Sequence, residues 1–374
     1  MGERPPRRVV PLADLGALTE DVRAEVYRVW SEIMATSRFV GGEVVGRFEA
    51  EWAQYCGSRE AIGVANGTDA IELVLRALRI GRGDEVIVPA NTFIATAAAV
   101  VNAGAVPHFV DVDPETLLVT AEAISAAVST RTAAVIAVDL YGSVPDMIGI
   151  KRLTDANGLA LIEDAAQGHG SSVNGRRAGS FGIAGCFSFY PGKNLGAFGD
   201  AGAVVTDDAA LAARIRSLAN HGRLPGSDTV HAAVGRNSRL DALQAAVLSV
   251  KLTRLDTWNE ARRSAVDVYR RLLGPEVRQL RVDSDSCRHL NVVLVPERDR
   301  VRARLAERGV ETSIHYPIPC HRQEPYRRYA DGPLPVVEAA AQEILTLPLF
   351  PGMTTNQIDL VCAALNELTA VAVA

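Results

Sequence analysis

Several features that define common protein classes are missing from this chain of 374 residues. Its five cysteines are scattered and form no Cys-x-x-Cys pair, which argues against a zinc site and against a disulfide framework. We therefore expect reduced thiols and no bound metal. Lysine and arginine number 39 against 44 aspartates and glutamates, so the net charge is -5, and no basic stripe supports nucleic acid as a partner.

The N-terminal region also lacks a long apolar run after its arginines. A signal peptide or a membrane-spanning helix requires such a run, so the sequence predicts neither. We expect a cytoplasmic protein without a membrane partner.

What the chain does contain is enough apolar sequence, 48% of its residues, for a large core, and its length favours two domains. We place the first domain at residues 1–250 and the second at 251–374, which begins with a long linking helix over 252–273. Within the first domain, apolar strands alternate with helical segments. This β-α-β order predicts an α/β fold with a mainly parallel sheet and helices on both faces.

One lysine stands in a Gly/Pro-rich turn between two apolar runs, in the stretch Ser188 to Gly196. A lysine that acts as a covalent nucleophile needs a rigid position and surroundings that lower its pKa, which a strand-end loop beside a cofactor supplies. Lys193 fits this description, although a solvated surface lysine would show the same local pattern. A P-loop is excluded, because Asn194 stands where Ser or Thr is required and Phe187 where the first glycine belongs.

An aspartate ends the apolar run upstream of this turn, at 159–164. The carboxyl end of a parallel strand faces the crevice where α/β proteins bind ligands. Pyridoxal phosphate needs a lysine that bonds its aldehyde and an acidic partner that keeps its pyridine nitrogen protonated. Lys193 and Asp164 together therefore predict a pyridoxal phosphate enzyme.

The residues Ser188 to Gly202, together with Glu163 to Gln167, resemble the signature of the DegT-like sugar aminotransferases. These form a branch of the fold-type I pyridoxal phosphate enzymes, and the resemblance extends from about Phe39 to the C-terminus. It implies a large cofactor-binding domain with a mostly parallel sheet flanked by helices, followed by a smaller C-terminal α+β domain. It also implies a homodimer with shared active sites.

The resemblance assigns further residues to the cofactor. Asn66-Gly67-Thr68 lies where a strand ends and a helix begins, which suits a phosphate, although a plain capped helix would look similar. In the family, the Gly-Thr pair and a serine bind the phosphate, an aromatic ring stacks on the pyridine, and an asparagine comes from the neighbouring subunit. The implied cofactor site consists of Gly67, Thr68, Phe93, Asp164, Gln167, Ser188, Lys193 and Asn237.

Three residues are expected to contact the substrate. His315 and Tyr316 stand in a His-Tyr-Pro loop that faces the active site in the family, although such a loop could also simply end an edge strand. Arg223 lies at the start of a long polar loop that follows a predicted helix over 211–219.

The resemblance implies transamination in two half-reactions, with Lys193 moving the proton and L-glutamate as the amino donor. The motifs look most like those of enzymes that aminate C-3 of thymidine-diphosphate 3-keto-6-deoxyhexoses in the amino-sugar biosynthesis of secondary metabolism. A C-4 keto-sugar or a cyclitol aminotransferase stays open, because it would keep the same cofactor residues. A sugar dehydratase of this fold would carry histidine in place of Lys193, and a binding protein would have lost Lys193 or Asp164.

Overall fold

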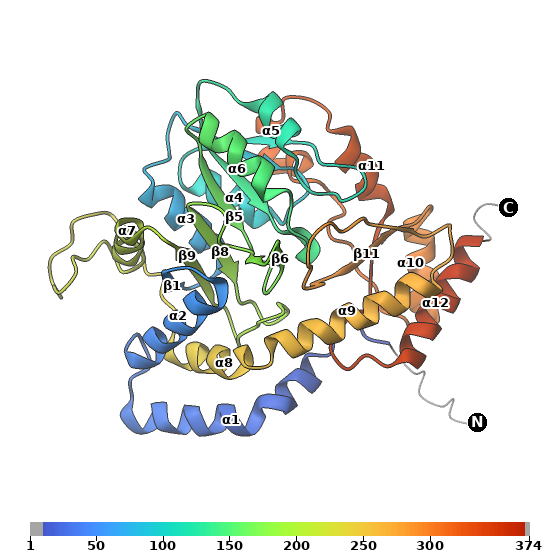
Figure 1. Ribbon diagram of the computed structural model, residues 1–374, viewed down its shortest axis with the longest axis horizontal. Helices are drawn as coiled ribbons and strands as arrows, with labels where there is room; N and C mark the ends of the chain where they lie inside the picture. The colour runs from blue at the N-terminus through green and yellow to red at the C-terminus, as the bar shows by residue number, and fades with distance from the viewer. Residues whose placement is uncertain (1–9, 371–374) are drawn as a thin grey trace.

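The computed structural model describes residues 10–370 and has a seven-stranded sheet at its centre (Figure 1). The strands of this sheet are β1 (Glu60–Val64), β2 (Glu85–Pro89), β3 (Val106–Val110), β4 (Thr132–Val138), β5 (Ala160–Asp164), β8 (Ala184–Ser188) and β9 (Gly202–Thr206). Five neighbours run parallel in the order β8, β5, β4, β2 and β3, and β9 lies antiparallel between β8 and β1. The predicted α/β class with a mainly parallel sheet is confirmed.

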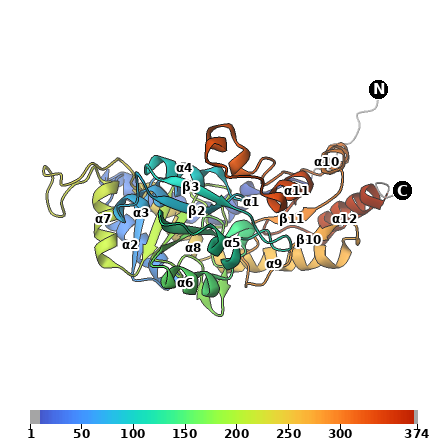
Figure 2. The same ribbon diagram turned by 90° about the horizontal axis from the view of Figure 1, so that it is seen from above.

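Helices cover both faces of this sheet (Figures 1 and 2). They are α1 (Leu15–Thr36), α2 (Glu43–Cys56), α3 (Gly67–Ala77), α4 (Ile94–Asn102), α5 (Ala121–Ala127), α6 (Met147–Ala156), α7 (Ala209–Ala219) and α8 (Ala242–Leu252). Along β4, Ala134 and Ile136 pack with α3, α4 and α7, whereas Val135 and Ala137 pack with α5 and α6. Successive side chains of a strand point to opposite faces, so both faces are buried, as a parallel sheet requires.

A smaller antiparallel sheet follows, with β11 (Asn291–Leu294) between β10 (Arg278–Gln279) and β12 (Ile344–Leu347). It shares an apolar core with α9 (Leu255–Leu272), α10 (Arg298–Glu307) and α12 (Thr355–Ala370), whereas α11 (Pro335–Glu343) packs against the core of the large sheet. The helix α9 runs from α8 toward this sheet (Figure 1). The domain division at residue 250 stays a prediction.

Two connecting segments belong neither to the large sheet nor to the helices that cover it. A short hairpin consists of β6 (Ser172–Val173) and β7 (Arg176–Arg177). Residues 220–241, between α7 and α8, form a long excursion without a helix or a named strand, and Figures 1 and 2 both show it reaching past α7 and away from the sheet. Among residues 10–370, no helix combines the length and the apolar character that crossing a membrane requires.

Candidate active site

Lys193 lies in the turn between β8 and β9, at the edge where the parallel strands end. Its backbone N–H donates to the Tyr190 carbonyl at 2.8 Å, which closes the turn. Gly196 is required in this turn, because a side chain there would collide with the carbonyl of Pro191. Burial lowers the pKa of Lys193 to about 8, so roughly a tenth of the amine is unprotonated at pH 7.

Asp164 is the last residue of β5, the strand that pairs with β8. Its carboxyl group is held by Thr96, whose hydroxyl donates to Oδ2 at 2.6 Å, and by the N–H of Ala166, which donates to Oδ1 at 3.2 Å. Burial raises the pKa of Asp164, although both donors and the positive charge of Lys193 act in the opposite direction. Asp164 and Lys193 are therefore close enough to influence each other's protonation.

The antiparallel strand β9 brings the ends of β1 and β8 together. Its first residue, Gly202, pairs with both Val64 and Ser188. As a result Gly67, which follows β1, lies directly against Ser188, because a Cβ atom added at Gly67 would stand 2.7 Å from Ser188 Cβ.

The first residues of α3 form the predicted phosphate cradle. Asn66 caps this helix through its Oδ1, which accepts the N–H of Asp69 at 2.8 Å. The N–H groups of Gly67 and Thr68 open the helix, where the helix itself supplies no acceptor. With the hydroxyl-bearing Ser188 beside them, these groups are suited to an anion.

Phe93 and Tyr316 come from distant segments and lie with their ring centroids 5.7 Å apart. Phe93 precedes α4 and is 52% exposed, so one of its faces is free for a planar ligand. Gln167 ties this region to the strand ends, because its Nε2 donates to the Tyr316 hydroxyl at 3.2 Å and its Oε1 accepts the Tyr141 N–H at 2.6 Å. Both ends of the Gln167 amide thus have protein partners.

His315 is half-buried, and its Nδ1 lies 2.8 Å from the Thr346 hydroxyl. Burial, with a smaller contribution from the positive charge of Lys193, lowers the pKa of His315 to about 4. The ring is therefore neutral at neutral pH. The Tyr141 hydroxyl donates to the backbone carbonyl of His315 and so fixes this loop next to Gln167.

Arg223 and Asn237 lie in the 220–241 excursion. The returning end of this excursion contacts α3 and the end of β1, because Arg236 pairs with Asp69 and Glu72 and Ser238 Oγ accepts the N–H of Ala65 at 3.1 Å. Asn237 is exposed and forms a backbone bridge with Asn220, and the guanidinium of Arg223 lies 3.6 Å from the carboxylate of Asp228. Within residues 10–370, none of their hydrogen bonds or ion pairs reaches Lys193.

Thr96, Tyr141 and Asn91 also belong to the site and were not predicted from the sequence. Asn91 Nδ2 donates to the Tyr141 hydroxyl at 3.4 Å and so supports the aromatic side of the site. A local signal existed for Thr96, because Thr92 stands one helical turn earlier and their hydroxyls lie 2.7 Å apart. No local signal marks Tyr141, whose partners are distant in sequence.

These residues fit pyridoxal phosphate. The site offers an amine whose pKa is lowered, a buried carboxylate, a helix N-terminus beside a serine hydroxyl, and an exposed aromatic face. They match the aldehyde, pyridine nitrogen, phosphate and ring of this cofactor.

The comparisons with known proteins agree with this geometry. A family model described as the DegT/DnrJ/EryC1/StrS aminotransferase family matches residues 20–366. The solved structure of NtdA from Bacillus subtilis with bound cofactor PMP has a TM-score of 0.92 and 32% identity, covering 98% of this chain and 86% of that chain.

Curated relatives match over nearly their whole length. The chain is 42% identical to the "Pleiotropic regulatory protein" of Geobacillus stearothermophilus, over 96% of this chain and 98% of that protein. It is 41% identical to the dTDP-3-amino-3,4,6-trideoxy-alpha-D-glucose transaminase of Streptomyces venezuelae, over 96% of each. It is 42% identical to the UDP-N-acetyl-3-dehydro-alpha-D-glucosamine 3-aminotransferase of Acidithiobacillus ferrooxidans, over 96% of this chain and 97% of that enzyme.

The match over most of the chain and the assembled site lead to the same conclusion. The chain belongs to the DegT/DnrJ/EryC1/StrS aminotransferase family, and it is an aminotransferase that depends on pyridoxal phosphate.

Proposed function

We propose that this enzyme transfers the amino group of L-glutamate to C-3 of a thymidine-diphosphate 3-keto-6-deoxyhexose. The observation that carries the proposal is the convergence of Lys193 and Asp164 at one edge of the sheet, beside the exposed ring of Phe93. The choice of C-3 is supported by the names of the Streptomyces and Acidithiobacillus relatives, which share this position although their nucleotides differ.

Each part of the cofactor has a proposed set of residues. Gly67, Thr68 and Ser188 would hold its phosphate, Asp164 its pyridine nitrogen, and Phe93 the face of its ring. Gln167 keeps the loop after β5 in place through Tyr141 and Tyr316. When bound, pyridoxal phosphate supplies an electron sink for the negative charge that forms on the reacting carbon.

Lys193 is the proposed proton carrier. Its Nζ takes the proton from the amino-bearing carbon of the donor and, in the second half-reaction, returns one to C-3 of the sugar. Nζ must be unprotonated to accept a proton, and its lowered pKa of about 8 makes this form accessible near neutral pH. His315 and Tyr316, on the neighbouring loop, are proposed to contact the sugar.

We further propose that the enzyme is a homodimer in which Asn237 and Arg223 complete the active site of the partner subunit. The excursion that carries them extends away from its own sheet (Figure 1). It also exposes apolar side chains, since Leu224, Val230 and Val234 are 41%, 50% and 84% exposed. A second subunit that covers this segment would remove these side chains from water.

All five cysteines are free and buried, which fits the reducing cytoplasm that the sequence analysis predicts. The role in secondary metabolism stays a prediction.

The donor half-reaction tests the proposal spectroscopically. The enzyme loaded with pyridoxal phosphate should show a visible absorbance band that is lost when L-glutamate is added and restored by 2-oxoglutarate. A regulatory protein that binds the cofactor without turnover would keep its band in glutamate, and that result would overturn the proposed reaction. Lys193→Ala is the control, because without the amine that carries the proton it should keep a visible band when glutamate is added.

A further inference from the structure

Asn194, the residue after Lys193, has its side chain hydrogen bonded to three separate partners. It is 3% exposed, whereas Lys193 itself is partly exposed. Asn194 Nδ2 donates to Asn259 Oδ1 at 2.8 Å and to the Cys287 carbonyl at 3.0 Å. Asn194 Oδ1 lies 2.9 Å from His289 Nδ1. Both amide protons and the amide oxygen are therefore engaged.

These contacts allow one orientation of the amide. The Cys287 carbonyl can only accept, so the nitrogen of Asn194 must face it and the oxygen must face His289. Burial and nearby positive charges hold the pKa of His289 well below its usual range, so its ring is neutral. His289 must then carry its single proton on Nδ1 and donate it to Asn194.

Asn259 extends the connection to the other half of the site. It lies on α9, is 1% exposed, and its Nδ2 donates to the carbonyl of His169 at 2.8 Å. His169 follows Asp164 on the loop after β5. The two amides thus join the turn of Lys193, the loop after Asp164 and the helix α9.

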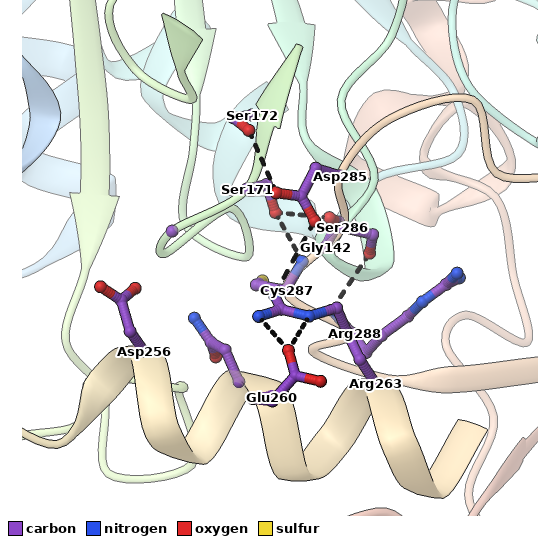
Figure 3. A network of polar contacts seen from close by, with 12 residues as sticks. Gly142, Ser171, Ser172, Asp256, Glu260, Arg263, Asp285, Ser286, Cys287 and Arg288 are labelled. Atoms are coloured by element: carbon purple, nitrogen blue, oxygen red, sulfur yellow. Dashed lines mark hydrogen bonds and ion pairs between the residues drawn. The ribbon is translucent and has the colours of Figure 1, made fainter. Parts of the chain in front are cut away.

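The segment around Cys287, to which Asn194 is hydrogen bonded, is held in place by hydrogen bonds of its own. Figure 3 shows Cys287 between Ser171 and the helix that carries Glu260 and Arg263. The N–H of Cys287 donates to Ser171 Oγ at 2.9 Å, and Ser171 Oγ donates to the Gly142 carbonyl at 2.6 Å. Asn194 is therefore bonded to a segment that does not depend on Asn194 for its own position.

The turn has an exposed tip between buried ends, since Phe189 and Leu195 are fully buried and the N–H of Ala197 donates to the Phe189 carbonyl at 2.8 Å. Tyr190 is exposed, Pro191 and Gly192 are partly exposed, and the buried side chains resume at Asn194. The ammonium group of Lys251 on α8 donates to the carbonyl of Gly196 at 2.7 Å.

We propose that Asn194 is a positioning residue, whose side-chain amide fixes the place and the solvent exposure of Lys193 by locking its turn onto α9 and the Cys287–His289 segment. This inference rests on the proposed function only in that it takes Lys193 to be the reacting amine. Loss of the amide frees the turn and admits water to Lys193, which makes its protonated form more favourable.

The pH at which Lys193 loses its proton should rise when the turn is freed and water enters, so this pH can be measured to test the proposal. The titratable groups that act on Lys193, or on which it acts, are Asp164, His169, Cys287, His289 and His315. The three histidines are neutral at the pH values of the test, since burial lowers the pKa of each of them. The negative charges that raise the pKa of Lys193 are those of Asp164 and, to a smaller extent, Cys287, and the substitution removes neither group.

The test compares Asn194→Ala with Asn366→Ala. Asn366 lies on α12 and also makes two hydrogen bonds, accepting from Gly274 N–H at 2.8 Å and donating to the Leu272 carbonyl at 2.8 Å. For each full-length protein without added cofactor, the rate of Lys193 acetylation is followed against pH by peptide mass spectrometry. The kcat and KM values of the loaded enzymes are measured beside it.

We expect the midpoint of Lys193 reactivity to rise by about one pH unit in Asn194→Ala and to stay unchanged in Asn366→Ala. The kcat of Asn194→Ala should fall roughly 10-fold to 100-fold, with KM values within about threefold, because misplacement of the reacting amine affects turnover more than binding. An unchanged midpoint and kcat, with stability reduced as in Asn366→Ala, would show that Asn194 serves folding alone and would overturn the proposal.

Asn259→Ala covers the case in which Asn194→Ala does not fold. It removes the link of Asn194 to α9 and the hydrogen bond to the His169 carbonyl, but leaves the bonds of Asn194 to Cys287 and His289. The same upward shift of the Lys193 midpoint is expected, and its absence would also overturn the proposal. Acetylation needs neither donor nor sugar, so a shifted midpoint without sugar turnover would refute the proposed substrate and leave the role of Asn194 intact.

Discussion

Two side chains of the candidate site have pKa values well below their ordinary ones. Burial brings the pKa of Lys193 to about 8 and that of His315 to about 4, so a base and a neutral ring stand in one site. Burial has the opposite effect on Asp164, because it raises the pKa of this carboxyl group. The low polarity of the site therefore prepares the lysine for proton transfer, and hydrogen bonds must keep the carboxylate ionised.

The rate of transamination should follow the protonation of Lys193. A lowered pKa means that the unprotonated amine accumulates as the pH rises through about 8. We therefore expect kcat to increase with pH to a midpoint near this value and then to level off, whereas an unperturbed lysine would place the midpoint at about 10.4. The measurement is kcat against pH at saturating donor and acceptor. A profile that is flat through neutral and mildly alkaline pH would contradict the assignment of Lys193 as the base.

Thr96 is predicted to matter through Asp164. Thr96→Val removes the hydroxyl that donates to Asp164 Oδ2 at 2.6 Å, so the carboxylate is harder to keep ionised. A hydrogen bond to a charged group contributes about 1.5–3 kcal/mol, which predicts a roughly 10-fold to 100-fold loss of kcat. Thr96→Ser keeps the hydroxyl and should retain most of the activity. Equal kcat values for the two variants would show that the contact has no catalytic effect.

The role of a single residue could be predicted from the sequence where a short motif of neighbouring residues marks it. Lys193 and Asp164 stand in short motifs at strand ends, and their chemistry can be inferred from residue type and place. Tyr141 and Asn194 gave no such signal, since their partners Gln167, Asn259 and His289 are distant in sequence and meet only in the folded chain.

At the scale of elements, the strand β9 explains how the residues of the proposed phosphate cradle come together. It pairs with β1 on one side and β8 on the other, so that α3 begins beside Ser188. The apolar runs of the sequence predicted the parallel strands, because such strands are buried on both faces. The antiparallel direction of β9 could not be predicted, because direction depends on its partners and an apolar run looks the same either way.

The close approach at Gly67 gives a prediction about α3. Gly67→Ala places a Cβ atom 2.7 Å from Ser188 Cβ, so the helix start or the strand end must move. We expect a loss of about 1–3 kcal/mol in the free energy of unfolding, together with weaker retention of pyridoxal phosphate.

The matched control is Gly46→Ala on α2, where an added Cβ atom meets nothing within 4 Å. This change should stabilise the protein by about 0.5–1 kcal/mol, because alanine favours the helix more than glycine does. Thermal unfolding and equilibrium dialysis of the cofactor measure both effects. Tight cofactor binding by Gly67→Ala would argue against a phosphate at this helix start.

At the scale of the whole molecule, the chain assembles most of the site, and much of the 220–241 excursion reaches past α7 and away from the sheet (Figure 1). The sequence predicted a long polar loop after α7, and the structure confirms a segment without a helix. The proposed function of Arg223 and Asn237 requires a second subunit, so neither the sequence pattern nor the fold of one chain could test it.

Mixing two inactive variants tests whether the sites are shared. Lys193→Ala and Asn237→Ala each remove one half of the proposed composite site. In a two-fold dimer that exchanges subunits randomly, about a quarter of all sites would regain both residues, so activity should return to roughly that fraction. Kinetic assays before and after subunit exchange by mild denaturation give the result. Failure of a proven mixed dimer to regain activity would show that Asn237 does not act in the partner's site.

The most direct measurement for the central claim is mass spectrometry of the products from thymidine-diphosphate 3-keto-6-deoxyglucose and its 4-keto isomer. Each is incubated separately with the pyridoxal phosphate-loaded enzyme and L-glutamate, and a uridine-diphosphate 3-keto sugar is included as a comparison. We predict the amino sugar from the thymidine-linked 3-keto substrate, at a rate well above that of the others. Amination of the 4-keto isomer alone would contradict the C-3 assignment, and reaction with none of the three would point to a cyclitol or another keto sugar as the acceptor.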